Sequence, residues 1–413
     1  MKLNKYFLFV FIYFFFNTLG LPIGLTYTAI LSPVFYWWVI KTHKKEILLP
    51  FLSVILIFVI FHISNGTDLK TYAVSFFNLT AVYIFCQAAY TFFKLSGEIE
   101  NIFWKLLVFN FILCLVAIPI YFTPYNNVLW IQQYLTEGVD NFLRLKLFTY
   151  EASYYATLFT PLFFFFVLQI IFKLNKHRIW LLLPMLFLPY ILSFSIGVMS
   201  AVFISLAITY LFYIKRLTRK RRVLTIISGG ILLAIVTIGI LFVFFPGNTL
   251  FLRLQNIITG TDSSGRGRTF EAFILAGQML DQKSYIWGIG LGQIKILGAE
   301  IIRDYYLYPM DHTVFTIPNA AAETLAIFGW VGFCLRIFIE LFLFIYTKVW
   351  TNYYRLILFL FIFIYQFTGS FITNLAEYVI WILAFTNVFN QFDVWSSIKT
   401  NRSQFSVIKN DLQ

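Results

Sequence analysis

The chain is dominated by long apolar runs that short polar segments separate. Many of these runs approach the ~20 residues that an α-helix needs to cross a bilayer. Hydrocarbon cannot satisfy free backbone polar groups, and runs of this length exclude a closed barrel, so the runs are predicted to be helices. We predict about twelve spans, at residues 6–22, 25–40, 47–64, 71–93, 103–122, 153–172, 179–195, 197–214, 223–245, 320–347, 356–373 and 378–392.

Composition agrees with this pattern. Hydrophobic residues make up 60% of the chain, charged residues 12%, and the mean hydropathy is +0.81. These values lie outside the range of soluble domains and predict an all-α polytopic membrane protein. The sequence shows no internal repeat and no soluble domain, so residues 1–413 are predicted to form a single membrane domain.

The basic residues predict the orientation. About two thirds of the 31 lysines and arginines fall in alternate connections if the N-terminus is cytoplasmic, in agreement with the positive-inside rule. Two long connections then lie outside the membrane: the first external loop (residues 123–152) and the second external loop (residues 246–318). The net charge of +13 is explained by topology signals such as residues 215–222, so no nucleic-acid partner is expected.

The second external loop carries the most informative chemistry. Arg266 and Arg268 flank a glycine just before residues 270–281, whose apolar spacing predicts an amphipathic helix. A helix N-terminus and a guanidinium fork both favour a phosphate group. The alternative is a solvated turn with two surface arginines. Residues 287–292, Trp-Gly-Ile-Gly-Leu-Gly, lack a preceding strand and are expected to form a flexible turn that returns the chain to the membrane.

Further candidates flank these segments. Arg144 and Glu151 stand just before a span, where they are candidates for the rim of a lipid-phosphate site or for an interfacial belt that touches lipid headgroups. His312 is a candidate base or a surface residue. Arg336 and Glu340, at i and i+4 inside a span, are predicted to neutralise each other. No cluster of acidic residues, histidines or cysteines stands outside the membrane, so neither metal nor cofactor is expected.

These segments resemble the Wzy-type O-antigen and capsular polysaccharide polymerases, within the superfamily that also contains the O-antigen ligases. Glu-Ala-Ser-Tyr-Tyr-Ala at 151–156 is similar to their Glu-Pro-Ser-aromatic-x-Ala segment, with Ala152 in the place of proline. Residues 193–197 are similar to their Ser-x-Ser-x-Gly helix start. The order of Arg266 and Arg268, the Gly-x-Gly-x-Gly at 288–292 and then Asn319 to Gly332 resembles their shared core, and Arg266 with Gly277 matches an Arg-x10-Gly pattern.

The resemblance implies a GT-C-like glycosyltransferase in the bacterial cytoplasmic (inner) membrane, with two extracytoplasmic loops that carry short helices. It would polymerise oligosaccharide repeat units linked to undecaprenyl pyrophosphate by an inverting, metal-independent displacement on the outer face. Arg144, Arg266 and Arg268 would bind pyrophosphate, and Glu151 or His312 would act as the base. Its partners would be the lipid-linked glycan donor and acceptor, membrane lipid and a candidate chain-length regulator protein.

Two alternatives come from other classes. An O-antigen ligase would share nearly all of these motifs but would transfer the glycan to lipid A core. A flippase or other transporter of lipid-linked oligosaccharide would need polar residues or broken helices near the middle of the membrane. The sequence places most of its charges outside the spans, which favours the polymerase.

The orientation can be tested with reporter fusions. Fusions at Asn141 and Thr261 are expected to report an exported position, and a fusion at Lys220 a cytoplasmic one, because short basic connections stay in the cytoplasm. The measurement is the activity of a reporter that folds only outside the cytoplasm. The reverse pattern would contradict the predicted topology and the outward-facing site.

Overall fold

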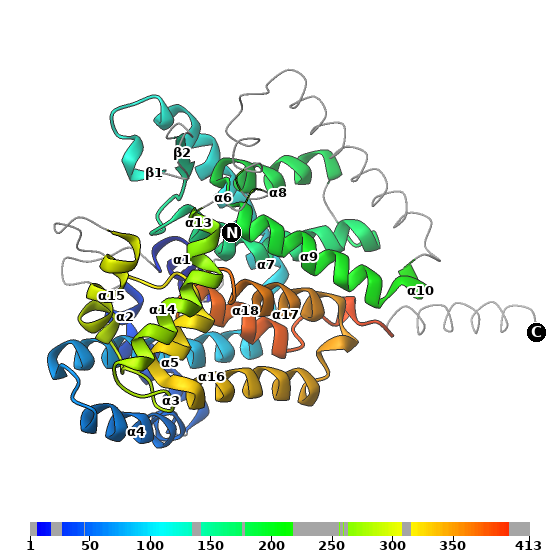
Figure 1. The fold of residues 1–413 in the computed structure, drawn as a ribbon. Helices are drawn as coiled ribbons and strands as arrows, with labels where there is room; N and C mark the ends of the chain where they lie inside the picture. Colours follow the sequence, from blue (N-terminus) through cyan, green and yellow to red (C-terminus); the bar gives the residue numbers. More distant parts are fainter. Residues whose placement is uncertain are drawn as a thin grey trace, which may run out of the picture.

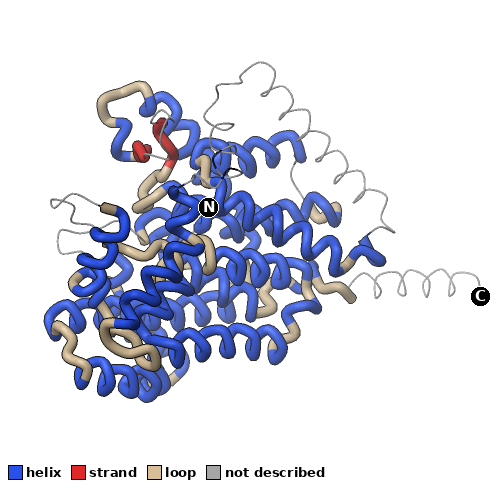
Figure 2. The backbone as a smooth tube through the Cα atoms, in the orientation of Figure 1, coloured by secondary structure: helices blue, strands red, loops and turns tan. Residues whose placement is uncertain are grey.

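The computed structural model describes residues 6–17, 27–44, 46–133, 142–175, 178–217, 256, 259, 263–307 and 315–395. Almost all of the regular structure in these residues is helical, and the strands are confined to one short hairpin (Figures 1 and 2). The helices are α1 (Phe7–Phe16), α2 (Tyr27–Ile30), α3 (Ser32–His43), α4 (Leu48–Ser64), α5 (Leu69–Leu95), α6 (Ile99–Tyr121), α7 (Ala152–Phe172), α8 (Ile179–Ser193), α9 (Ile196–Phe212), α10 (Ile214–Leu217), α13 (Ser263–Arg268), α14 (Phe270–Asp281), α15 (Leu297–Tyr306), α16 (Ala320–Tyr346), α17 (Tyr353–Tyr365) and α18 (Leu375–Phe385).

Four of these helices, α5, α6, α7 and α16, are long and apolar enough to cross a membrane. The prediction of a helical membrane protein is confirmed at this level, while the number of spans stays a prediction. Six shorter apolar helices, α1, α4, α8, α9, α17 and α18, overlap other predicted spans, and α17 and α18 each begin three residues before theirs. Residues 223–245 lie outside the described part. The predicted span 25–40 is divided into α2 and α3. Pro33 stands in the first turn of α3, where the missing proline N–H would have no helical partner.

The first external loop differs from the expectation of short helices. Its described residues, 123–133 and 142–152, form one 3-10 turn, Asn126–Val128, and an antiparallel hairpin of β1 (Trp130–Gln133) and β2 (Phe142–Leu145). Trp130 pairs with Leu145, and both side chains are buried. The Trp130 indole N–H donates to the Ala117 carbonyl at 2.9 Å, which anchors the hairpin to α6.

The contacts of α1 show which segments lie at each of its ends. At one end of α1, the Lys105 ammonium at the start of α6 lies 5.5 Å from the Phe7 ring centre. At the other end of α1, Phe16 stacks on Phe148 of the first external loop. For α1, the end predicted to be cytoplasmic therefore contacts the start of α6, and the end predicted to be external contacts the first external loop. Which side is which stays a prediction.

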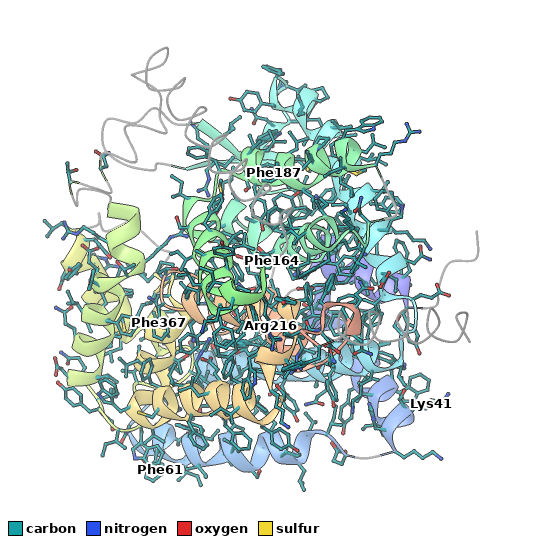
Figure 3. The ribbon with its side chains drawn as sticks, turned by 90° about the vertical axis from the view of Figure 1, so that its right-hand side faces the viewer. Lys41, Phe61, Phe164, Phe187, Arg216 and Phe367 are labelled. Carbon is teal, nitrogen blue, oxygen red and sulfur yellow. The ribbon has the colours of Figure 1, made fainter. Side chains whose placement is uncertain are left out.

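The core is an aromatic cluster around α7. In α7, 83% of the apolar stretch is buried inside the protein, against 28% in α16, so α7 is central and α16 presents an apolar face outward. Figure 3 shows Phe164 of α7 in the middle of the bundle, while Phe61 of α4 and Lys41 of α3 lie near its edge. Phe164 and Phe165 are fully buried among rings from α6, α17 and the segment after α18.

Helices α17 and α18 form a short hairpin that starts and ends on one side of the bundle. Asn352, before α17, pairs with Asp393, after α18. The buried Arg355 guanidinium donates to the carbonyls of Ala384 and Phe385 and thereby caps the C-terminus of α18. At ~1.5 Å per residue, the 13 residues of α17 cover only about 20 Å. Helices α17 and α18 are therefore too short to complete a crossing. The hairpin tip, residues 366–374, meets the external segments inside the bundle.

Helix α16 is broken at Gly329, whose φ of 65° lies in the left-handed region. The break removes the usual i−4 partners from the backbone around it, and free backbone groups are costly in an apolar setting. The second external loop supplies replacements through four backbone hydrogen bonds: Trp330 N–H to Tyr285, Val331 N–H to Ile286, Ile289 N–H to Ala326 and Gly290 N–H to Ile327. We call residues 285–290 with 326–331 the backbone interlock.

Two glycines allow this close approach. A Cβ at Gly329 would lie 2.3 Å from the Ile286 carbonyl oxygen, and a Cβ at Gly288 would lie 2.3 Å from that of Ile327. The His62 Nε2 atom, 2.8 Å from the Trp287 carbonyl oxygen, attaches the same turn to α4. The turn does return to the membrane helices as expected, but the expectation of flexibility is wrong, because each of its sides is held by hydrogen bonds.

The interlock predicts that Gly329→Ala destabilises the protein. The added methyl group would clash with the Ile286 carbonyl, and alanine rarely adopts a φ of 65°. Together these effects should lower the free energy of unfolding by ~1–3 kcal/mol. Gly277→Ala is the matched control, because Gly277 in α14 has nothing within 4 Å of its Cβ position and alanine favours a helix. Melting temperatures in detergent should fall for Gly329→Ala and stay level or rise for Gly277→Ala. Equal melting temperatures for the two variants would contradict the interlock.

Candidate functional site

The two predicted external loops meet at an ion pair. The Arg268 Nη2 atom lies 2.7 Å from the Glu151 Oε1 atom. Glu151 is the residue before α7, with an extended backbone, and Arg268 ends α13 just before α14 begins. Two candidates that stand 117 residues apart in the sequence are thus brought together at the predicted external side.

Glu151 is buried, and Arg268 keeps 26% of its side chain exposed. Burial by itself would raise the pKa of Glu151, but the charge and hydrogen bond of Arg268, with smaller contributions from Ser153 and Arg144, outweigh it and lower the pKa to about 2. The carboxylate is therefore ionised at neutral pH and is a weak base. This geometry suits a residue that orients the Arg268 guanidinium better than one that accepts a proton.

Arg144 lies behind this pair. It is 4% exposed, and its Nε atom donates to the Ser193 carbonyl at 3.0 Å. That carbonyl belongs to the C-terminal end of α8, where a positive charge is favourable. Because it is buried, Arg144 is poorly placed for either predicted contact, with lipid headgroups or with pyrophosphate oxygens. It adds positive charge to the site and ties β2 to α8.

Arg266 occupies a different environment. Its side chain is 59% exposed, and its Nη2 atom pairs with Glu271 at 2.9 Å. The Tyr306 hydroxyl donates to the other Glu271 oxygen at 3.0 Å, so α15 is linked to the start of α14. The glycine-rich turn is in fact the short helix α13, and residues at i and i+2 of a helix do not share a face. Arg266 and Arg268 therefore pair with different carboxylates, and only Arg268 contacts Glu151.

Two further residues at this site had little or no signal in the sequence. The Asn319 side chain is fully buried, donates to the carbonyls of Arg268 (2.8 Å) and Phe367 (2.7 Å), and caps α16 by accepting from Ala322. It joins the arginine backbone to the hairpin tip. Tyr365, the last residue of α17, lies beside Ser153 and within the field of Arg268 and Glu151. In the sequence, only the family resemblance points to Asn319, and Tyr365 lies in an apolar run that gives no signal of a functional role.

A second polar cluster lies deeper in the bundle and holds the hairpin tip. The Arg336 Nε atom donates to Glu340 (3.1 Å) and to Gln366 (2.8 Å), and its Nη2 atom pairs with Glu377. The Glu377 carboxylate also accepts from Ser370 at 2.6 Å. The predicted pair of Arg336 and Glu340 is confirmed and is part of a larger network. One guanidinium faces two carboxylates there, so the network joins α16, α17 and α18 through charge.

The remaining candidates can be placed briefly. His312 lies outside the described residues, so its position relative to Glu151 stays a prediction. In the part of the chain that the structure describes, no group of three or more histidine, cysteine, aspartate or glutamate side chains could hold a metal ion.

Comparison with known proteins returns no relative: no family model, no curated protein and no solved structure matches this chain. The resemblance to Wzy-type polymerases thus stays a hypothesis. Its motif segments, dispersed in the sequence, do lie together in space. Glu151 contacts Arg268, Ser193 contacts Arg144, and Asn319 contacts the Arg268 carbonyl.

The ion pair makes a prediction about pH. Because the folded-state pKa of Glu151 lies below its ordinary value of 4.5, the pair adds stability that is fully present above that value and is lost as the pH falls toward about 2. Glu151→Gln should therefore lower the melting temperature by a constant amount between about pH 8 and about pH 5, and the difference should narrow below about pH 4.5. Glu300→Gln, at an exposed position on α15, is the control and should leave the melting temperature unchanged. A difference that disappears near neutral pH would contradict the assignment.

Proposed function

We propose that this protein is a membrane glycosyltransferase that polymerises oligosaccharide repeat units carried on a polyprenyl pyrophosphate. The observation that carries the proposal is the contact between Arg268 and the buried Glu151, at the junction of both external loops and the hairpin tip. A partly exposed guanidinium, held by a carboxylate and backed by the charge of Arg144, is suited to pyrophosphate oxygens.

In the proposed reaction, the hydroxyl of one lipid-linked glycan attacks the anomeric carbon of another. The bond from that carbon to pyrophosphate breaks, and the pyrophosphate leaves with its charge. Arg268 stabilises this charge, and Glu151 fixes the direction of the guanidinium. Glu151 is assigned this positioning role instead of the role of base, because its pKa is low and it is paired. His312 is then the remaining candidate for the base, and a single displacement inverts the anomeric centre.

The lipid part of the substrate needs an apolar path to this site. Helix α16 presents large exposed apolar side chains, among them Trp330, Phe338 and Phe342. Its N-terminus lies next to Arg268 through Asn319. A polyprenyl chain in the bilayer could therefore lie along α16 while its pyrophosphate reaches the arginine. This arrangement supports a lipid-linked donor over a soluble nucleotide sugar.

The structure also contains features that favour a second candidate function, the transport of lipid-linked oligosaccharide. Transporters place broken helices and polar groups inside the membrane. Here α16 is broken at Gly329, and α17 and α18 are short. Arg336 is mostly buried and pairs with the buried Glu340 and Glu377. Purified protein in liposomes separates the two candidates: a polymerase lengthens the glycan, and a transporter moves it across the bilayer unchanged. A ligase would be recognised by glycan on lipid A core.

Arg268→Lys tests the role of the guanidinium. Lysine keeps the charge but loses the paired donors, and the loss of one preorganised donor typically lowers a rate by ~10²–10³-fold. The length distribution of lipid-linked glycan, measured in cells at matched protein levels, should therefore shift strongly toward single repeat units.

Arg216→Lys is the control for the same chemical change at a distant position. Arg216 lies in α10, exposed, with its guanidinium 4.2 Å from the Trp395 ring centre. This variant should make glycan of normal length. Long chains from Arg268→Lys would remove Arg268 from the mechanism and leave Arg266 as the leading candidate.

A further inference from the structure

A polar groove lies between α14 and α15, outside the site described above. Its volume is about 430 Å³, within the ~300–1,000 Å³ that is usual for ligand sites. It is lined by Gln278 and Asp281 of α14, by Gln282 directly after that helix, and by Ile301, Asp304 and Tyr305 of α15. Each helix contributes residues at i, i+3 and i+4, which lie on one helical face.

The packing of the two helices explains why this groove is open. Gly298 of α15 lies against Met279 of α14, and a Cβ at Gly298 would be 2.6 Å from the Met279 Cε atom. The helices are therefore closest at this point, where Met279 and Ile302 are buried in their shared core. The longer polar side chains stand on the neighbouring, exposed faces, and they border the groove instead of filling it.

The chemistry of the lining selects a class of ligand. Two carboxylates, two amides, one phenol and the apolar Ile301 surround the groove, and no basic side chain among the described residues lines it. One Asp281 oxygen already accepts from the Tyr285 hydroxyl, so the Asp304 carboxylate and the amides are the main groups that can bind a ligand. Carboxylates and amides form hydrogen bonds with hydroxyl groups, and the tyrosine ring offers a flat apolar surface. The two negative charges disfavour phosphate and acidic sugars. The lining therefore fits a neutral or basic sugar and does not fit the pyrophosphate.

The distance between the groove and Arg268 along α14 is consistent with one substrate that contacts both. Arg268 precedes the first turn of α14, and Asp281 is its last residue, so ~1.5 Å per residue puts the groove roughly 20 Å from the arginine. Figure 1 shows α14 running from α13 along α15. A sugar in the groove would belong to the distal part of an oligosaccharide whose pyrophosphate lies at Arg268.

We infer that the groove between α14 and α15 is a glycan subsite that holds a neutral or amino sugar of the lipid-linked oligosaccharide. The inference rests on the proposed function for the identity of the substrate. The groove itself can be tested without any reaction, because it should bind sugars that carry neither lipid nor phosphate.

The experiment uses the full-length protein in detergent and saturation-transfer NMR with a panel of free hexoses, N-acetylhexosamines and hexosamines. At least one neutral or amino sugar should bind, and glucuronic acid should not. Asp304→Asn and Gln278→Ala should each weaken that binding by about tenfold, the effect expected from one lost hydrogen bond to a charged or well-placed group. Glu300→Gln, on α15 but outside the groove lining, should bind as the unchanged protein does.

Each outcome has a distinct meaning. The subsite would be overturned if no sugar binds. It would also be overturned if both groove variants bind sugar as the unchanged protein does and have normal melting temperatures. Calcium binding that Asp304→Asn abolishes, with no sugar binding, would show a cation site instead. If the groove variants weaken sugar binding, the subsite is supported. If Arg268→Lys then polymerises normally, the proposed catalytic role of Arg268 is contradicted while the subsite stands.

Discussion

Backbone groups that lose their partners inside an apolar bundle must find others, and the position of the external segment depends on this constraint. The break at Gly329 in α16 exposes N–H and carbonyl groups that residues 285–290 satisfy. The same contacts fix the chain after α14, because Trp287 is also held by His62. Helix α14 packs on α16 between this fixed end and the Asn319 contact with Arg268. The arginine is thus positioned by the membrane helices on both sides.

Charge inside the bundle provides a second level of organisation. Arg336 holds the start of the hairpin tip through Gln366, and Glu377 holds its middle through Ser370. One residue further along the tip from Gln366, the Phe367 carbonyl accepts from Asn319, which also binds the Arg268 carbonyl. The buried network and the external ion pair are therefore linked by a short path of hydrogen bonds.

Three chemically different surfaces of the protein correspond to the three parts of the proposed substrate. Positive charge from Arg268 and Arg144 is concentrated at the start of α14, and negative charge from Asp281 and Asp304 borders the groove at its end. The apolar face of α16 provides the third environment. A lipid-linked oligosaccharide has the same three parts: an apolar chain, a pyrophosphate and a glycan. This correspondence supports a substrate that is held along its whole length rather than at one group.

The sequence by itself determined the elements that depend on local composition. Apolar runs predicted α5, α6, α7 and α16 with ends that differ by at most about four residues, and the period of residues 270–281 predicted α14. Hydropathy and helical spacing are properties of neighbouring residues, so the sequence alone reveals them. Long-range pairing decided the rest. The division of Arg266 and Arg268 between Glu271 and Glu151, the position of Tyr365, and the interlock across Gly329 depend on contacts between segments far apart in the chain. No local pattern encodes which carboxylate an arginine meets or which backbone repairs a broken helix, because those partners are chosen only when the helices pack.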